Sequence, residues 1–382
     1  MSTANLSALA AISPQLVLVF ASVAHFEQPE FAAQLRAAFP DADIVGCSTA
    51  GEISPCGVRD QTASVTALHF NRPAHRVTHT ELCDMADSRA AGLRLGMQVA
   101  AEGLHNVFVL GQGVGINGSA LIDGLSSTLG PSVKISGGLA ADGGRIQRTY
   151  VLDQHGVSTT RIVALGFCGA TIEVRHGHFG GWRPFGPARV VTRADGNILY
   201  ELDGERALDL YRRYLGSYAR DLPASGLLFP LAMLGEDHKE LGLVRTILGI
   251  DEVAGSLILA GDLIVGGYVQ LMHATTDALV DGAVAAAKMA WRPTTARAAL
   301  GRDDASTSEP ELAILISCVG RKLIMGHRIG EEVEAVRAVF GATTEVTGFY
   351  SNGEIGPFSA TAPAKLHNQT MTITTIREVD VT

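Results

Sequence analysis

The chain contains 382 residues, of which 47% are hydrophobic and 18% charged, a balance that supports two domains with their own cores and excludes intrinsic disorder. The formal net charge is −9 and no run of Lys or Arg occurs, so we exclude binding to a nucleic-acid backbone. Five cysteines without a Cys-x-x-Cys pair favour reduced thiols over structural zinc or covalently attached haem. No apolar run reaches the roughly 18 residues of a membrane span, and we expect a cytoplasmic protein that does not enter the membrane.

The first elements of the chain alternate between strand and helix patterns. Apolar residues fill Leu16–Ser22, and large apolar residues then recur every four positions from Phe31 to Phe39, as on one face of a helix. A short strand leads into the motif Gly46–Ile53, whose glycines permit a tight backbone. A strand at Gln61–Thr66 follows.

A second segment repeats this alternation and has a glycine-rich turn, Gly137–Gly143, in place of the motif. Its predicted helices and strands are Ala90–Glu102, Val107–Leu110, Ala120–Leu129, Val133–Ser136, Thr149–Asp153 and Ile162–Phe167. We interpret this segment as a further, diverged copy of the first.

The middle of the chain differs in character. His176–Pro187 is rich in Gly, Pro and aromatic residues, which predicts a loop between domains or over a site. A helix at Glu205–Leu215, a meander of strands over Leu227–Met272 and a helix at Ala278–Trp291 follow.

The last segment matches the first in the order of its elements. Strand Leu312–Cys318, helix Val333–Phe340, motif Gly348–Ile355 and strand Gln369–Thr374 correspond to the four opening elements. This agreement indicates an internal repeat. We therefore predict an α/β fold of two domains, built from repeated strand-helix-strand-turn-strand units with mixed sheets.

Several motifs together resemble the FIST family, a bacterial sensory module with N-terminal and C-terminal halves. They are Gly46–Ile53, Gly137–Asp142, Ser317–Arg321, Gly348–Ile355 and Leu366–Thr370. The resemblance covers nearly the whole chain in the family's order, and it implies domains at residues 1–204 and 205–382.

The stretch Gly180–Pro187, followed by Val191–Arg193 and Leu199–Gly204, is similar to the stand-alone FIST proteins known as NosP. This similarity implies binding of haem b, sensing of nitric oxide, and regulation of a partner sensor histidine kinase or cyclic-di-GMP enzyme. The alternative that the family implies is a haem-free receptor for an amino acid or another small metabolite. Asn352 stands where relatives commonly carry an aromatic residue.

The segment Gly113–Gly118 fits the G-x-G-x-x-G pattern between a strand and a helix. A dinucleotide fold also needs an acidic residue at the end of the next strand, and Val133–Ser136 supplies none. We interpret the glycines as serving a loop with positive φ or close packing.

The two Gly-Glu-Ile turns carry the first candidate ligand contacts. Glu52 and Glu354 occupy equivalent turns, where they either contact a ligand or cap backbone amides that the turn leaves unpaired. Cys47, Ser48 and Thr49 resemble a nucleophile cluster. The twin motif has Phe in the cysteine's place and no His lies nearby in sequence, so we expect a packed thiol and no enzyme.

Four further residues complete the candidate ligand-binding set. Arg321 follows a strand end, where a guanidinium could bind a carboxylate or a haem propionate, and an exposed cation is the plain alternative. Tyr350 and Ser351 belong to the second motif. His367 precedes the repeated strand and either contacts ligand or anchors that strand.

A noncovalently bound haem needs one imidazole on its iron, an apolar slot and an open sixth position. The candidates for the iron ligand are His178, His273 and His176. His176 and His178 are two residues apart and would share one face of a strand. His273 follows an apolar strand. Each is otherwise an ordinary surface or hydrogen-bonded histidine.

Overall fold

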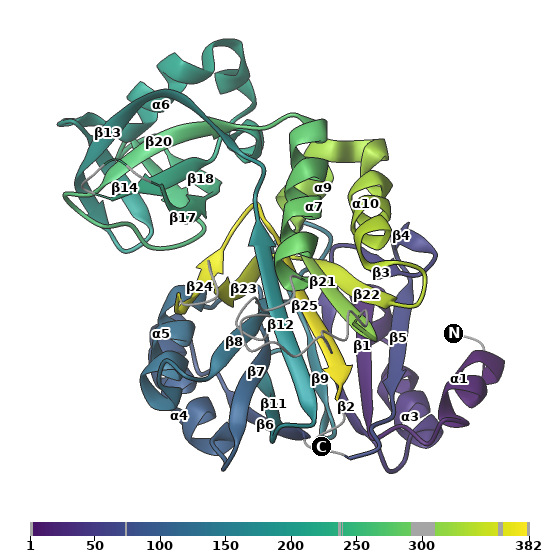
Figure 1. The fold of residues 1–382 in the computed structure, drawn as a ribbon. Coiled ribbons are helices and arrows are strands. Elements are labelled where there is room, and N and C mark those ends of the chain that lie inside the picture. The colour runs from purple at the N-terminus through teal and green to yellow at the C-terminus, as the bar shows by residue number, and fades with distance from the viewer. Residues whose placement is uncertain are drawn as a thin grey trace, which may run out of the picture.

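The computed structural model describes residues 3–72, 75–235, 238, 240–291, 310–357 and 362–379. Within these residues the strands form four sheets. Three sheets build the large lower body of Figure 1, which we call the core, and the fourth lies in a smaller body above it, which we call the small domain. The mixed α/β fold predicted from the sequence is confirmed. No helix of the described chain is long and apolar enough to cross a membrane.

The core contains three copies of one arrangement, in which a central strand has a parallel neighbour on one side and an antiparallel neighbour on the other. In the first copy, β1 (Leu16–Ser22) lies between β2 (Asp43–Thr49) and β5 (Ala63–Leu68). The other copies consist of β7 (Leu104–Gly111), β8 (Lys134–Leu139) and β11 (Arg161–Cys168), and of β21 (Leu312–Cys318), β22 (Glu345–Ser351) and β25 (Met371–Glu378). The diverged middle segment therefore folds as a copy of the other two.

One glycine has the same place in all three copies. Gly46, Gly137 and Gly348 each lie opposite a residue of the central strand. A Cβ atom built on them would lie 2.1, 1.9 and 1.8 Å from that residue's carbonyl oxygen. A larger residue would collide with the backbone, which explains why the repeat keeps glycine here.

The strand that follows each motif leaves its own sheet and pairs with the next one. β3 (Glu52–Ser54) pairs with β22, β23 (Gly353–Pro357) pairs with β8, and β9 (Val151–Asp153) pairs with β2. The exchange runs from the first copy to the third, from the third to the second and from the second to the first. It closes the three copies into a ring.

The remaining core strands extend the three sheets. They are β4 (Gly57–Arg59), β6 (His75–Glu81), β10 (Gly156–Ser158), β12 (Ile172–Phe179) and β24 (Ala364–His367).

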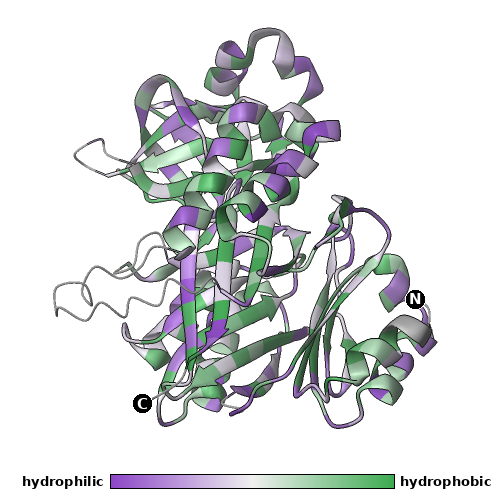
Figure 2. Cartoon of the chain, turned by 45° about the vertical axis from the view of Figure 1, so that its right-hand side comes forward, coloured by the Kyte–Doolittle hydropathy of each residue, from purple (hydrophilic) through white to green (hydrophobic). Residues whose placement is uncertain are grey.

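The inner faces of the three core sheets share one apolar interior, to which Phe20, Phe108 and Phe349 belong. Figure 2 shows the hydrophobic residues concentrated along these strands. Helices cover the outer faces: α1 (Thr3–Ala10), α2 (Val23–Phe26) and α3 (Pro29–Ala38) on the first sheet, α4 (Ser88–Val99) and α5 (Gly118–Leu129) on the second, and α7 (Thr276–Trp291), α9 (Val319–Met325) and α10 (Gly330–Phe340) at the third.

The small domain is a β structure covered by one helix, α6 (Ala207–Leu215), whose apolar face packs on the sheet. Its strands are β13 (Arg183–Asp195), β14 (Ile198–Leu202), β15 (Glu205–Arg206), β16 (Leu231–Leu234), β17 (Glu240–Arg245), β18 (Ile247–Asp251), β19 (Ser256–Leu259) and β20 (Tyr268–His273). The chain enters it before β13 and leaves it after β20 (Figure 1). The domain boundary at residue 204 stays a prediction. In the structure, the strands just before and just after this residue, β14 and β15, both belong to the small domain.

The prediction of a loop at His176–Pro187 is wrong for most of this segment. β12 pairs with β25 and β13 pairs with β20, so only residues 180–182 lie outside strands. Glycine in this segment does not indicate a loop, because Gly177 allows β12 to pack closely on α7: a Cβ there would lie 1.8 Å from the carbonyl oxygen of Ala286 in α7. His176 and His178 share one strand, as their spacing predicts.

Candidate functional site

The turns that follow β2, β8 and β22 meet at one end of the core. Backbone hydrogen bonds join them in a ring: Ala141 N–H to the Ser48 oxygen at 2.8 Å, Ala50 N–H to the Tyr350 oxygen at 2.9 Å, and Asn352 N–H to the Leu139 oxygen at 3.2 Å. The two motifs recognised in the sequence, at opposite ends of the chain, are therefore neighbours. All nine residues predicted to contact ligand are at most 2% exposed. Their contact with a ligand stays a prediction.

The Glu52 carboxylate makes hydrogen bonds to two parts of its own unit. Its Oε1 accepts a hydrogen bond from the Thr49 hydroxyl, and its Oε2 accepts from the Thr62 backbone N–H at 2.9 Å and the Thr62 hydroxyl at 2.6 Å. Thr62 lies just before β5, so the carboxylate joins the motif turn to the strand that completes the unit. These contacts support the capping interpretation.

Glu354 makes the same contacts in the last unit. Its carboxylate accepts from the Ser351 hydroxyl at 2.7 Å, and from the Thr370 backbone N–H at 3.2 Å and hydroxyl at 2.9 Å. Burial raises the pKa of Glu354 to about 7, because desolvation penalises the charged carboxylate more than these donors stabilise it. In the middle unit the register puts Val151 at this place, so that copy has lost the carboxylate.

The cysteine and hydroxyls of the first motif are engaged in the fold. Cys47 belongs to the shared apolar interior, and burial raises the pKa of its thiol well above the ordinary value. The Ser48 hydroxyl donates to the Ala141 carbonyl at 2.8 Å and accepts from the Tyr150 N–H at 2.9 Å. A protonated, enclosed thiol is a poor nucleophile.

Arg321 is fully buried in α9 beside Glu332 of α10. Its Nη2 lies 2.8 Å from the Glu332 Oε2, and the guanidinium also donates to the carbonyls of Gly180 at 2.5 Å and Leu279 at 2.9 Å. The Tyr350 hydroxyl donates to the other oxygen of Glu332 at 2.8 Å. The exposed-cation alternative does not describe Arg321. Glu332 was not among the residues predicted from the sequence, although an acidic residue four positions before Val336 on an apolar helix face was a usable signal.

His178 and His367 form a second buried group, with ring centroids 3.9 Å apart. The Nε2 of His367 lies 2.9 Å from the Gly356 carbonyl oxygen, the strand-anchoring contact that was one of its two predicted roles. Burial lowers the pKa of His367 to about 4 and that of His178 well below the ordinary value. Both imidazoles are therefore neutral at neutral pH.

The small domain meets the core above this group, along a contact that we call the seam. Arg245 of β17 donates to the Leu366 carbonyl at 3.3 Å, and the Trp182 indole N–H donates to the Gln369 carbonyl at 2.7 Å. Arg245 is 4% exposed, and burial lowers its pKa to about 10. Arg245 gave no signal in the sequence, because Leu366, its partner in the core, lies more than a hundred residues away.

The G-x-G-x-x-G segment is a close-packed loop at the start of α5. A Cβ at Gly113 would lie 1.6 Å from the Ala140 carbonyl oxygen, and Gly115 has a φ of +71°. Asn117 caps the helix by accepting from the Ala120 N–H at 3.0 Å. These contacts are those of a packed turn, as interpreted from the sequence.

The three histidines predicted as haem-iron ligands lie in different surroundings. His178 is buried, and His176 is partly buried with a ring nitrogen 2.6 Å from the Asn106 Nδ2. His273 is exposed at the end of β20, paired across the strands with Arg183 and with its ring 6.2 Å from that of Phe185.

The chain thus combines a repeated α/β core with a small β domain, and the thiol and hydroxyls of its first motif are engaged in the fold. The FIST N domain model matches residues 15–205 and the FIST C domain model matches residues 207–357. The chain therefore belongs to the FIST family, sensory domains that bind small ligands in signal transduction.

Relatives among curated proteins are similarly long. An uncharacterized protein of Mycobacterium tuberculosis is 25% identical over 91% of this chain and 88% of its own length. An uncharacterized protein of Mycobacterium bovis is 26% identical over 60% of this chain and 57% of its own. Among solved structures, a cyanuric acid hydrolase from A. caulinodans has a TM-score of 0.32 at 11% identity, over 99% of this chain and 94% of its own. A chorismatase has a TM-score of 0.35 at 10% identity, over 95% and 92%.

Proposed function

We propose that the chain is a receptor for a small molecule with a carboxylate group, such as an amino acid, bound at the seam between core and small domain. Binding there changes the angle between the two bodies and so the surface offered to a signalling partner, such as a sensor histidine kinase or a cyclic-di-GMP enzyme. The observation that carries the proposal is the buried guanidinium of Arg245.

The contacts of Arg245 are all with carbonyl oxygens. Its Nε donates to the Asp262 backbone oxygen at 3.0 Å, and its Nη1 to the oxygens of Leu366 and, at 3.4 Å, Val244. Among the residues that the structure describes, Arg245 forms no ion pair; the Asp262 carboxylate is near enough to offset part of the lowering of its pKa by burial, but it accepts hydrogen bonds from Asn117 instead. A buried cation is costly to leave unpaired, and a ligand carboxylate would compensate it with two parallel hydrogen bonds.

The position of Arg245 also favours a sensory role. The seam lies next to the motif turns, at the end of the core where β21 and β22 finish, and ligands of α/β sheets are typically found beyond the carboxyl ends of strands. The small domain is joined to the core by two chain connections, at residues 180–182 and 274–275, which can act as a hinge.

We expect one or more ligands in a panel of amino acids and small carboxylates to raise the thermal unfolding midpoint of the protein. A ligand at about 100 times its Kd adds about 2.7 kcal/mol to the free energy of unfolding. Arg245→Met should abolish the rise and Arg245→Lys should weaken it, whereas Arg213→Met, at an exposed arginine of α6, should preserve it. A panel without effect, or a rise unchanged in Arg245→Met, contradicts the proposal.

A second candidate function, sensing of nitric oxide through haem b, is favoured by the surroundings of His273. His178 is buried beside His367 and His176 contacts Asn106, so a porphyrin at either imidazole would need the space that these neighbours occupy. His273 fits better: it is exposed, the partly exposed ring of Phe185 offers an apolar face, and Arg183 could hold a propionate.

If this second function is correct, protein incubated with haemin should show a Soret band that shifts when nitric oxide is added. His273→Ala should remove the band, and His327→Ala, at an exposed histidine elsewhere, should retain it. A wild-type protein without a Soret band, or a band unaffected by His273→Ala, excludes His273 as the ligand.

A further inference from the structure

A polar cluster interrupts the inner face of the core where the first and second sheets meet. Asp153 lies on β9, on the face opposite Leu152, which packs on the outer helices. Its side chain therefore points inward and is fully buried. His79 of β6 lies on the same face as Val77, which packs against the shared interior. The two polar groups thus point toward each other from different sheets.

A possible metal-ligand set is formed by His79, Asp153 and His155. Each residue offers one nitrogen or oxygen atom, and these three atoms lie within 4.8 Å of one another. The Oδ2 of Asp153 lies 3.0 Å from the Nδ1 of His79, yet this oxygen accepts no hydrogen bond within the described residues. The His155 ring stands edge-on to that of His79, with centroids 4.8 Å apart. A buried carboxylate oxygen that lies 3.0 Å from one imidazole, close to a second, and accepts no hydrogen bond is an arrangement that a cation can complete.

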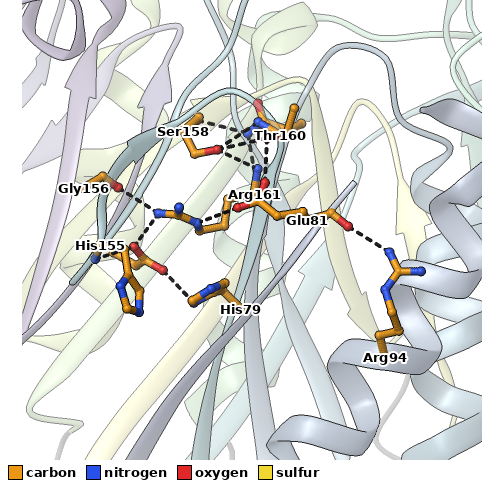
Figure 3. A network of polar contacts seen from close by, with 10 residues as sticks. His79, Glu81, Arg94, His155, Gly156, Ser158, Thr160 and Arg161 are labelled. Atoms are coloured by element: carbon orange, nitrogen blue, oxygen red, sulfur yellow. Dashed lines mark hydrogen bonds and ion pairs between the residues drawn. The ribbon is translucent and has the colours of Figure 1, made fainter. Parts of the chain in front are cut away.

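The other oxygen of the carboxylate is held in place. Arg161 donates to the Asp153 Oδ1 at 2.6 Å and also binds Glu81 at 3.1 Å, and the His155 backbone N–H donates to Oδ1 at 2.8 Å (Figure 3). These bonds fix the carboxylate plane and leave Oδ2 next to the Nδ1 of His79. Such outer contacts are what orients the ligands of protein metal sites.

We propose that His79, Asp153 and His155 bind one divalent transition-metal cation, with zinc as the best fit to two imidazoles and one carboxylate. The ligand atoms around a tetrahedral zinc ion lie about 3.3 Å apart, so at least one of the three side chains must move closer to the other two when zinc binds. His155 can do so because it is exposed in the turn between β9 and β10. Three protein ligands leave one position for water or a ligand atom. The cation would also join the hairpin of the first sheet to β6 of the second.

Cobalt(II) and zinc titrations of the full-length protein, first treated with a chelator, test this proposal. We expect one equivalent of cobalt to give the visible absorption of a four- or five-coordinate ion, and zinc to displace it. His155→Ala changes an exposed side chain and should preserve folding, while it weakens metal affinity at least about tenfold, since even changes to outer contacts cost that much. His79→Gln should weaken binding similarly.

His327→Ala serves as the control, because it removes an exposed histidine outside the cluster and should leave affinity unchanged. Three results would overturn the proposal: no saturable cobalt or zinc binding, binding that His155→Ala and His79→Gln leave intact, or equal loss in His327→Ala. In each case the cluster is only a His79–Asp153 ion pair. None of these readouts depends on the carboxylate receptor proposed above, so the two proposals fail separately.

Discussion

Arg321→Met should lower the free energy of unfolding by about 3–5 kcal/mol, the largest effect that we expect of a single substitution in this chain. The ion pair between Arg321 and Glu332 is fully enclosed, with both side chains 0% exposed. Removing the guanidinium leaves the buried Glu332 carboxyl without its cation, and among the described residues the hydroxyls of Ser317 and Tyr350 remain as its donors. Urea unfolding followed by circular dichroism measures the change.

Two further variants separate the buried charge from general loss of packing. Arg321→Met combined with Glu332→Gln should cost less than the sum of the two single changes, because the pair is neutral again. Arg328→Met, which removes a partly exposed arginine that pairs with Glu331 and Asp277, should have little measurable effect. If Arg321→Met behaves like Arg328→Met, the enclosed pair does not stabilise the fold.

The protein should lose stability as the pH falls below about 6.5, because the imidazoles of His367, His178 and His176 have lowered pKa values and are neutral in the native state. Burial lowers the pKa of His367 to about 4 and that of His178 well below 6.5, and the unfolded chain restores both. Between these pKa values the unfolded state binds protons that the native state does not, so acid favours unfolding. For His367 the lowered pKa corresponds to a loss of about 3 kcal/mol in the free energy of unfolding at low pH, at about 1.4 kcal/mol per pKa unit.

Glu354 acts in the opposite direction. Its pKa is raised to about 7, so the native state takes up a proton before the unfolded chain does, and this contribution grows as the pH falls from about 7 toward 4.5. Urea midpoints measured between about pH 7.5 and 4.5 should therefore fall less steeply than these histidines alone would require. His367→Gln should flatten the profile and Glu354→Gln should steepen it, whereas His327→Gln should leave it as in the wild type. A wild-type midpoint that stays constant across this range contradicts the assigned protonation states.

The repeated elements could be predicted closely because their signals are local. Strands Leu16–Ser22 and Leu312–Cys318 have the predicted bounds, and the helices at Pro29–Ala38 and Gly330–Phe340 begin two or three residues earlier than their apolar patterns. Local reasoning failed at His176–Pro187, where Gly and Pro normally indicate a loop. There the distant strand β25 and helix α7 supply the pairing and the packing.

For the site, the sequence identified the motif residues and not the partners that define their roles. Glu52 and Glu354 were recognised as equivalent, and the capping contacts with Thr62 and Thr370 follow from the same repeat. Arg245 gave no signal, because the core atoms that it contacts lie more than a hundred residues away.

By itself the sequence determined the type and order of the elements, the internal repeat and the family, since periodicity and motif spacing act over short stretches of chain. Only the tertiary structure decided that each motif's outgoing strand completes another copy's sheet, as β9 does for β2 across about a hundred residues. It also decided which charges are buried. Burial depends on the closure of the ring of three copies and on the small domain that covers its end, and no local pattern encodes either contact.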